Sequence, residues 1–197
     1  MFCSLALSLF SESMSAPLPV TTISQTYSLT VLLRTDTAQL LTTYLKYQGS
    51  PFSDRGLSDR GLQLTGLPVA AAAFCGWRQQ RVEERLGENF KAYSVYIDFL
   101  QLVTDDQTAL NPTALDLLKL LRKTHSRIRM LIGKLAGLMT GLGLTIPEVA
   151  VDRLPAGSLS ASDWERKIRG YVVCLGLTNW LERTVRDLTI LKKKHRQ

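Results

Sequence analysis

The chain has 197 residues, of which 45% are hydrophobic and 21% are charged, and its formal net charge is +7 at pH 7. This length and composition predict one folded domain with a sizeable core, and they exclude an intrinsically disordered chain. The positive charge favours an acidic partner: an anionic glycan, an acidic receptor surface, a membrane surface or nucleic acid.

The N-terminal residues resemble a signal peptide in part. An apolar run over residues 2–10 is followed by small residues, but no positively charged segment precedes the run. Two alternatives stay open: a signal peptide over residues 1–16 that is cleaved to leave a domain of residues 17–197, or an N-terminus that is not cleaved.

The three cysteines, Cys3, Cys75 and Cys174, are too few for a disulfide scaffold, and their spacing fits no zinc motif. Cys75 and Cys174 could pair if Cys3 leaves with the leader. Two separate buried thiols are the favoured alternative.

Apolar residues recur three or four positions apart in four stretches, which predicts long helices at about residues 23–48, 72–103, 112–143 and 163–194. Asn111 and Pro112 are typical of an N-cap followed by proline at the first helical position. Ser162 and Glu165 have the spacing of a capping box at the start of the last helix.

The connections between these helices are expected to be long, short and long. A link over residues 104–110 can only join antiparallel neighbours, whereas links of about 16 to 22 residues can run the length of a helix. We therefore predict an all-α fold, a long-chain four-helix bundle with up-up-down-down topology and two long crossover loops. An up-down-up-down bundle stays possible, but it would leave both long loops without a reason.

Gly133, Gly137 and Gly141 lie four residues apart on one face of the predicted third helix. Such spacing occurs in transmembrane dimers, but Arg129 and Lys134 interrupt the apolar run, so a membrane span is not expected. We expect a groove in which another helix of the bundle approaches closely.

The sequence carries no recognisable catalytic, metal-binding or cofactor-binding motif. Its two histidines are His125, which lies on an apolar stripe, and His195. The basic run over residues 192–196 suits a heparin-like glycan or nucleic acid, although a solvated helix end is the favoured interpretation. We therefore expect no enzyme, no cofactor and no metal.

Two features of the last helix suggest a recognition surface. Trp164 precedes most of the apolar stripe, which predicts an exposed aromatic side chain at the tip of the bundle. Arg183 and Asp187 share one face, where a surface ion pair is slightly favoured over half of a recognition surface.

Several short blocks, in this order, resemble one family: YSLT (27–30), TYLKYQGSPF (43–52), LPVA (67–70), ERLGENFKAY (84–93), LNPT (110–113), SDWERK (162–167) and WLERTVRDLTILKKK (180–194). The family is that of the interleukin-6-type cytokines, in the branch of ciliary neurotrophic factor and cardiotrophin-like cytokine factor. The resemblance covers about residues 27–194.

The resemblance implies a secreted growth factor with neurotrophic activity that assembles receptor chains and activates JAK-STAT signalling. The aromatic-x-x-Lys motif that contacts the leukaemia inhibitory factor receptor in this family corresponds to Trp164 and Lys167. The surface for an alpha receptor, like that of ciliary neurotrophic factor, corresponds to Arg34, Asp36, Trp77, Arg183 and Asp187. Val31 and Thr189 replace basic residues of ciliary neurotrophic factor, which leaves the identity of the alpha receptor open.

The resemblance also implies a site for the shared signal transducer on the exposed faces of the first and third long helices, and it suggests a secretion partner. Heparin-like glycans are a further expected partner, whereas nucleic acid and a membrane span are not expected. The alternative function is a basic intracellular helical bundle that binds nucleic acid or anionic glycans.

Overall fold

A computed structural model describes residues 19–54, 62–70, 74–149, 154 and 160–195. These ranges form five helices: α1 (Pro19–Gln48), α2 (Phe74–Gln79), α3 (Val82–Leu110), α4 (Leu115–Gly141) and α5 (Asp163–Lys194). The described residues contain no strand, and the predicted all-α four-helix bundle is confirmed. The expected signal peptide over residues 1–16 lies outside the described residues.

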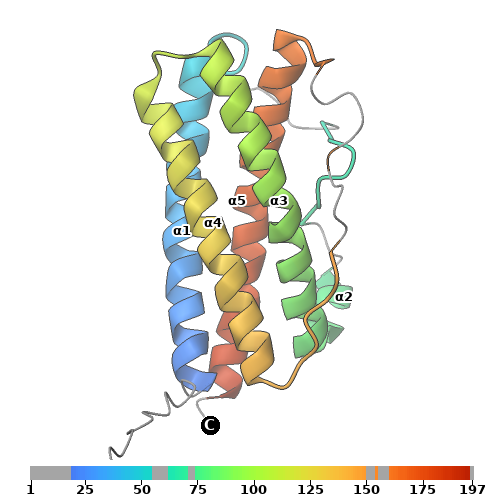
Figure 1. The fold of residues 1–197 in the computed structure, drawn as a ribbon. Helices are drawn as coiled ribbons and strands as arrows, with labels where there is room; N and C mark the ends of the chain where they lie inside the picture. The colour runs from blue at the N-terminus through green and yellow to red at the C-terminus, as the bar shows by residue number, and fades with distance from the viewer. Residues whose placement is uncertain (1–18, 55–61, 71–73, 150–153, 155–159, 196–197) are drawn as a thin grey trace, which may run out of the picture.

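The four long helices run up, up, down and down in chain order (Figure 1). The chain from α1 to α3 and the chain from α4 to α5 both cross the length of the bundle, whereas α3 and α4 are joined directly at one end. α1 and α3 each pack against both α4 and α5. The short helix α2 lies outside the bundle, beside the start of α3.

Two predicted helix boundaries need correction. The expected helix over 72–103 is divided into α2 and α3, and α3 continues through the supposed link as far as Leu110. Asn111 is the C-cap of α3, since its N–H is bonded to the carbonyl oxygen of Gln107, and Ala114 is the N-cap of α4. The Asn-Pro pair therefore ends one helix and turns the chain, instead of starting the next helix.

The core lies along the inner faces of all four long helices. Its largest fully buried side chains include four aromatic residues, three of which come from α3: Tyr44, Tyr93, Tyr96 and Phe99. Burying a large apolar side chain contributes about 1.5–3 kcal/mol. Cys174 lies in this core as a free thiol, and its burial raises its pKa to about 12. The side chain of Cys75 lies outside the described residues.

The glycines of α4 do not form the expected groove. Gly133, Gly137 and Gly141 are exposed, and a Cβ added at any of them would meet no atom within 4 Å. The close approach occurs on α5, where a Cβ at Gly170 would lie 2.1 Å from the hydroxyl oxygen of Tyr44. No helix in the described part of the chain is long and apolar enough to cross a membrane.

Replacing Gly170 and Gly137 separately tests this difference. Gly170→Ala is expected to destabilise the fold by about 2 kcal/mol, because the new methyl group displaces the ring of Tyr44. Gly137→Ala is expected to stabilise it by about 0.5–1 kcal/mol, because alanine has the higher helix propensity and the site is open. Urea denaturation followed by circular dichroism measures both changes. Equal effects of the two substitutions would contradict the packing described here.

Candidate functional site

Trp164 lies in the first turn of α5. Ser162 caps this helix: its hydroxyl accepts a hydrogen bond from the N–H of Glu165, and the Glu165 carboxylate accepts one from the N–H of Ser162. This confirms the predicted capping box, which fixes the backbone of the first turn. Trp164 is 52% exposed, and its predicted exposure is confirmed.

The indole of Trp164 packs on Phe52, a residue that the sequence analysis did not single out. Their ring centroids are 5.2 Å apart, and Phe52 also contacts Tyr171 at 6.4 Å. Phe52 is buried in the turn that follows α1, where Gly49 adopts a positive φ of 69°. One face of the indole is thus held by the chain while much of the ring stays open to solvent. The only feature of the sequence that pointed to Phe52 was its place in TYLKYQGSPF, the block at residues 43–52 that resembles the cytokine family.

Lys167 lies one turn after Trp164 and joins α5 to the end of α1. Its ammonium group donates a hydrogen bond to the carbonyl oxygen of Gln48 at 3.3 Å, and the side chain is partly buried. A cation at this place complements the negative end of the α1 dipole. The structure therefore brings Trp164 and Lys167 to the same end of the bundle.

A buried polar frame holds this end together. The Tyr44 hydroxyl donates to the carbonyl oxygen of Lys167 at 2.9 Å and accepts a hydrogen bond from the Gln107 amide. Burial raises the pKa of Tyr44 well above its ordinary value, so the hydroxyl stays a donor. Arg169 donates to the Asp106 carboxylate from two guanidinium nitrogens, from Nε at 2.9 Å and from Nη2 at 2.7 Å. α1, α3 and α5 are therefore fixed to one another next to Trp164.

A second polar cluster lies toward the other end of α5 and includes three of the expected site residues. The Trp77 indole N–H donates to Asp187 at 2.8 Å, and Arg85 forms an ion pair with the same carboxylate at 2.7 Å. Asn89 donates to the other oxygen of Asp187 at 3.0 Å. The guanidinium of Arg85 also lies over the ring of Trp77. This cluster attaches α2 to α3 and α5.

Arg183 and Asp187 are not a surface ion pair, so the favoured interpretation of this pair was wrong. They are only 4% and 2% exposed, and their closest ion-pair distance is 3.9 Å. Arg183 instead forms its close ion pair with Glu88 and packs on Trp180. These two charged groups are buried between helices, where they position α2 and α3 rather than face solvent.

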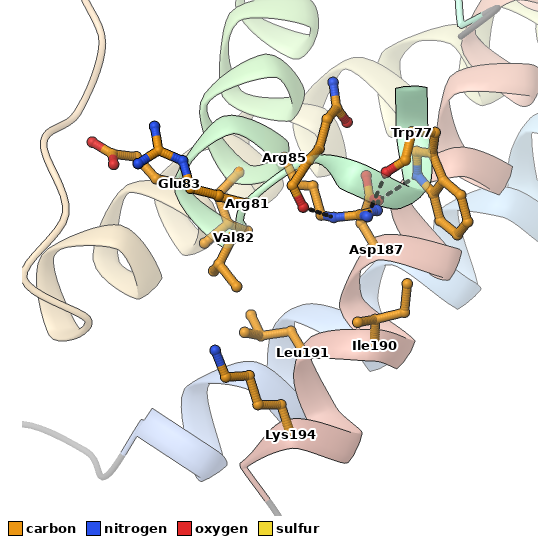
Figure 2. A pocket seen from close by; sticks show the side chains of 11 residues that line it. Trp77, Arg81, Val82, Glu83, Arg85, Asp187, Ile190, Leu191 and Lys194 are labelled. Atoms are coloured by element: carbon orange, nitrogen blue, oxygen red, sulfur yellow. Dashed lines mark hydrogen bonds and ion pairs between the residues drawn. The ribbon is translucent and has the colours of Figure 1, made fainter. Parts of the chain in front are cut away.

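A pocket of about 560 Å³ opens beside this cluster. Figure 2 shows Ile190, Leu191 and Lys194 of α5 on one side of the pocket and Val82 of α3 across from them, with Trp77 and Asp187 at its end. Ile190 is 42% exposed, and Lys194 is exposed as well. The pocket thus combines an apolar wall with a charged rim, to which Lys194, Arg81 and Glu83 contribute.

Arg34 and Asp36 of α1 are separated by the fold. Arg34 is exposed, whereas Asp36 is only 6% exposed and forms ion pairs with Lys123 and Arg127 of α4. The spacing in the sequence was a signal for this burial, since Asp36 lies three residues after the buried Leu33 and four before the buried Leu40, on the same face of the helix. The structure places Asp36 between α1 and α4.

The described residues hold no group of three or more His, Cys, Asp or Glu side chains that could bind a metal ion. His125 is partly buried, and its pKa is lowered by burial and by the neighbouring charge of Arg129.

Asp187→Asn is expected to destabilise the protein by about 3 kcal/mol, because it breaks the buried ion pair between Asp187 and Arg85. Glu182→Gln is the matched control, since Glu182 is an exposed acid on the same helix. Thermal denaturation measures both variants. Substitutions at exposed sites usually change the stability by less than about 0.5 kcal/mol. A change that small for Asp187→Asn would contradict this structural role.

The sequence matches the family model described as plethodontid receptivity factor PRF over residues 13–197. It is 44% identical to cardiotrophin-2 of Mus musculus over 98% of this chain and 95% of that protein. It is 34% identical to cardiotrophin-1 of Mus musculus over 84% of this chain and 83% of that protein. Ciliary neurotrophic factor of the same organism is 27% identical over 83% and 79% of the two chains. The chain therefore belongs to the plethodontid receptivity factor family of interleukin-6-type cytokines, and it is a helical cytokine, not an enzyme.

Proposed function

We propose that this cytokine is secreted and brings receptor chains together, so that their associated kinases activate STAT transcription factors. The observation that carries this proposal is Trp164, a large aromatic side chain that stays half exposed although the fold fixes its position. Binding hot spots are enriched in tryptophan, and a side chain held in place before binding loses little conformational entropy.

Trp164 and Lys167 are proposed to contact a receptor similar to the leukaemia inhibitory factor receptor. The Phe52 ring supports the indole from below, and the bond from Lys167 to the end of α1 fixes the ammonium group nearby. An aromatic anchor beside a cation suits a complementary pocket with acidic groups at its rim. Phe52 is therefore a positioning residue for this surface.

An alpha receptor is proposed to bind the pocket between α2, α3 and α5. Its accessible groups on α5 are the apolar side chain of Ile190 and the charged end of Lys194, and the exposed Arg81 and Glu83 line its other side. This surface depends indirectly on Trp77, Arg183 and Asp187. Their polar groups form hydrogen bonds and ion pairs inside the protein, so their main effect is to hold α2 in place. Arg34 is an exposed cation that can contribute directly, whereas Asp36 acts by fixing α1 against α4.

The shared signal transducer is proposed to bind the outer faces of α1 and α4. These helices are antiparallel neighbours, with Gln25 beside Lys134 and Asp36 beside Lys123. The same pairing of the two helices places Leu32 and Met130 at similar positions along the bundle axis, and both side chains are exposed. Exposed apolar side chains on adjacent helices are a suitable centre for a protein interface.

The net charge of +7 also favours an anionic glycan, such as a heparin-like chain, as a partner outside the cell.

Two single substitutions at opposite ends of α5 test the receptor assignments. Trp164 and Ile190 are separated by 26 residues, or about 39 Å along the helix. Trp164→Ala is expected to weaken binding to the soluble ectodomain of the leukaemia inhibitory factor receptor by about 30-fold, the loss typical of a hot spot. Ile190→Ala is expected to leave that affinity unchanged and to weaken binding to the ectodomain of the ciliary neurotrophic factor receptor alpha. Biolayer interferometry measures all four affinities.

Each substitution is the control for the other, because both remove an exposed apolar side chain from the same helix. In responsive cells, Trp164→Ala combined with Lys167→Ala is expected to abolish STAT phosphorylation while the melting temperature stays nearly unchanged. Normal binding of Trp164→Ala to the leukaemia inhibitory factor receptor would show that this surface is assigned wrongly.

Secretion is tested separately by expressing the chain with its own N-terminus in cultured cells. The protein is expected in the medium, either alone or after co-expression of a secretion partner. Retention in the cell lysate under both conditions would favour the intracellular alternative instead.

A further inference from the structure

The outer face of α4 carries six cations that the receptor surfaces at the two ends of α5 do not use. They are Lys119, Arg122, Lys123, Arg127, Arg129 and Lys134. At 3.6 residues per turn they fall within an arc of about 160°, and they extend for about 22 Å along the helix axis. The cations therefore form one continuous basic face, here called the α4 basic face.

Three of these cations are free to bind a ligand. Lys119, Arg122 and Arg129 are exposed, and they form no hydrogen bond or ion pair with any other residue that the structure describes. Lys123 and Arg127 share the single carboxylate of Asp36, so one positive charge of this trio stays uncompensated. Lys134 donates only to the neutral amide of Gln25.

The net positive charge is highest on this helix, at +5 against +4 on the longer α5. α4 contains six Lys or Arg residues and one Asp, whereas the neighbouring α3 contains two Lys or Arg residues and six Asp or Glu. An anionic ligand is thus attracted to α4 and repelled from α3. This asymmetry aligns an elongated polyanion with the axis of α4.

The face continues toward the end of α4 without bulky side chains. Gly133, Gly137 and Gly141 are exposed and have open space where a side chain would lie. A long ligand that lies on the cations can therefore follow the helix surface past Lys134 without meeting an obstacle from these positions.

The chemistry of the face distinguishes among polyanions. α4 contains no Phe, Tyr or Trp on which bases could stack, and stacking accounts for much of the binding of single-stranded nucleic acid. A helix that lies in a membrane surface must insert its apolar face, but here that face is buried against α1 and α3. Sulfated polysaccharide needs neither feature, because its sulfates are dense and lie along an extended chain.

We propose that the α4 basic face binds a sulfated glycosaminoglycan. This inference specifies the surface for the glycan partner named above. It is independent of the receptor contacts at Trp164 and Ile190, but it shares the outer face of α4, including the exposed Met130, with the surface proposed for the shared signal transducer, so the two ligands would compete there. It places the main glycan contacts on α4 and not on the basic residues at the end of α5.

The test compares two triple variants that remove the same charge. Lys119→Gln, Arg122→Gln and Arg129→Gln remove the three free cations of α4. Arg186→Gln, Lys193→Gln and Lys194→Gln remove three exposed cations of α5 and serve as the matched control. Surface plasmon resonance on immobilised heparin measures the affinity from 50 to 300 mM NaCl, and circular dichroism checks that both variants are folded.

The α4 variant is expected to bind heparin about tenfold more weakly or worse. Its plot of log affinity against log salt is expected to be about half as steep, because three of six cations are lost. The α5 variant is expected to stay within about threefold of the parent.

Three results would overturn the proposal. The first is a larger loss for the α5 variant than for the α4 variant, which would place the site at the end of α5. The second is binding of the parent protein to fully desulfated heparin as tight as binding to heparin. The third is equal or tighter binding to duplex DNA or phosphatidylserine vesicles at the same salt concentration, which would assign the face to another anion. None of these results concerns receptor binding at Trp164, so the two proposals fail independently.

Discussion

The contact between Tyr44 and the backbone of α5 determines how the ends of α1 and α5 are arranged. The phenol lies directly against Gly170, where any side chain would collide with it, and its hydroxyl donates to the carbonyl oxygen of Lys167. Because this bond is made to the backbone, it fixes the helix itself and not one rotamer. The position of Trp164, one turn earlier on the same helix, follows from it.

Buried charge has a related role at the other end of α5. Asp187 accepts hydrogen bonds from Trp77, Arg85 and Asn89, which belong to two other helices. Removing one member of such a cluster costs more than the intact pair contributes, because the remaining charge loses its partner while it stays buried. Residues at this surface can therefore affect receptor binding through the placement of α2 without touching a receptor.

The local signals in the sequence predicted the fold well. The capping box at Ser162 and the basic end of α5 define a helix with the expected ends, because both signals act within one turn. The missed features depend on partners that are distant in the sequence. Residues 104–110 look like a polar link, yet Asp106 and Gln107 are held in a helix by Arg169 and Gln48.

The candidate site was likewise predictable only where the signal is local in the sequence. The exposure of Trp164 was predictable from its place before the apolar stripe, but the support from Phe52 was not, since 112 residues separate the two. The burial of Asp36 and Asp187 was missed because a charged residue is normally exposed unless a partner is present. Their partners, on α4 and α3, become neighbours only in the folded chain.

The Trp164 surface is assembled from two parts of the chain, the turn after α1 and the first turns of α5. A synthetic peptide that copies only the start of α5 would lack the ring beneath the indole and the carbonyl that holds the lysine. Such a peptide is a poor competitor for the whole protein, and antisera raised against it or against denatured protein will mostly miss the native epitope. Neutralising reagents for this surface have to be selected on the folded molecule.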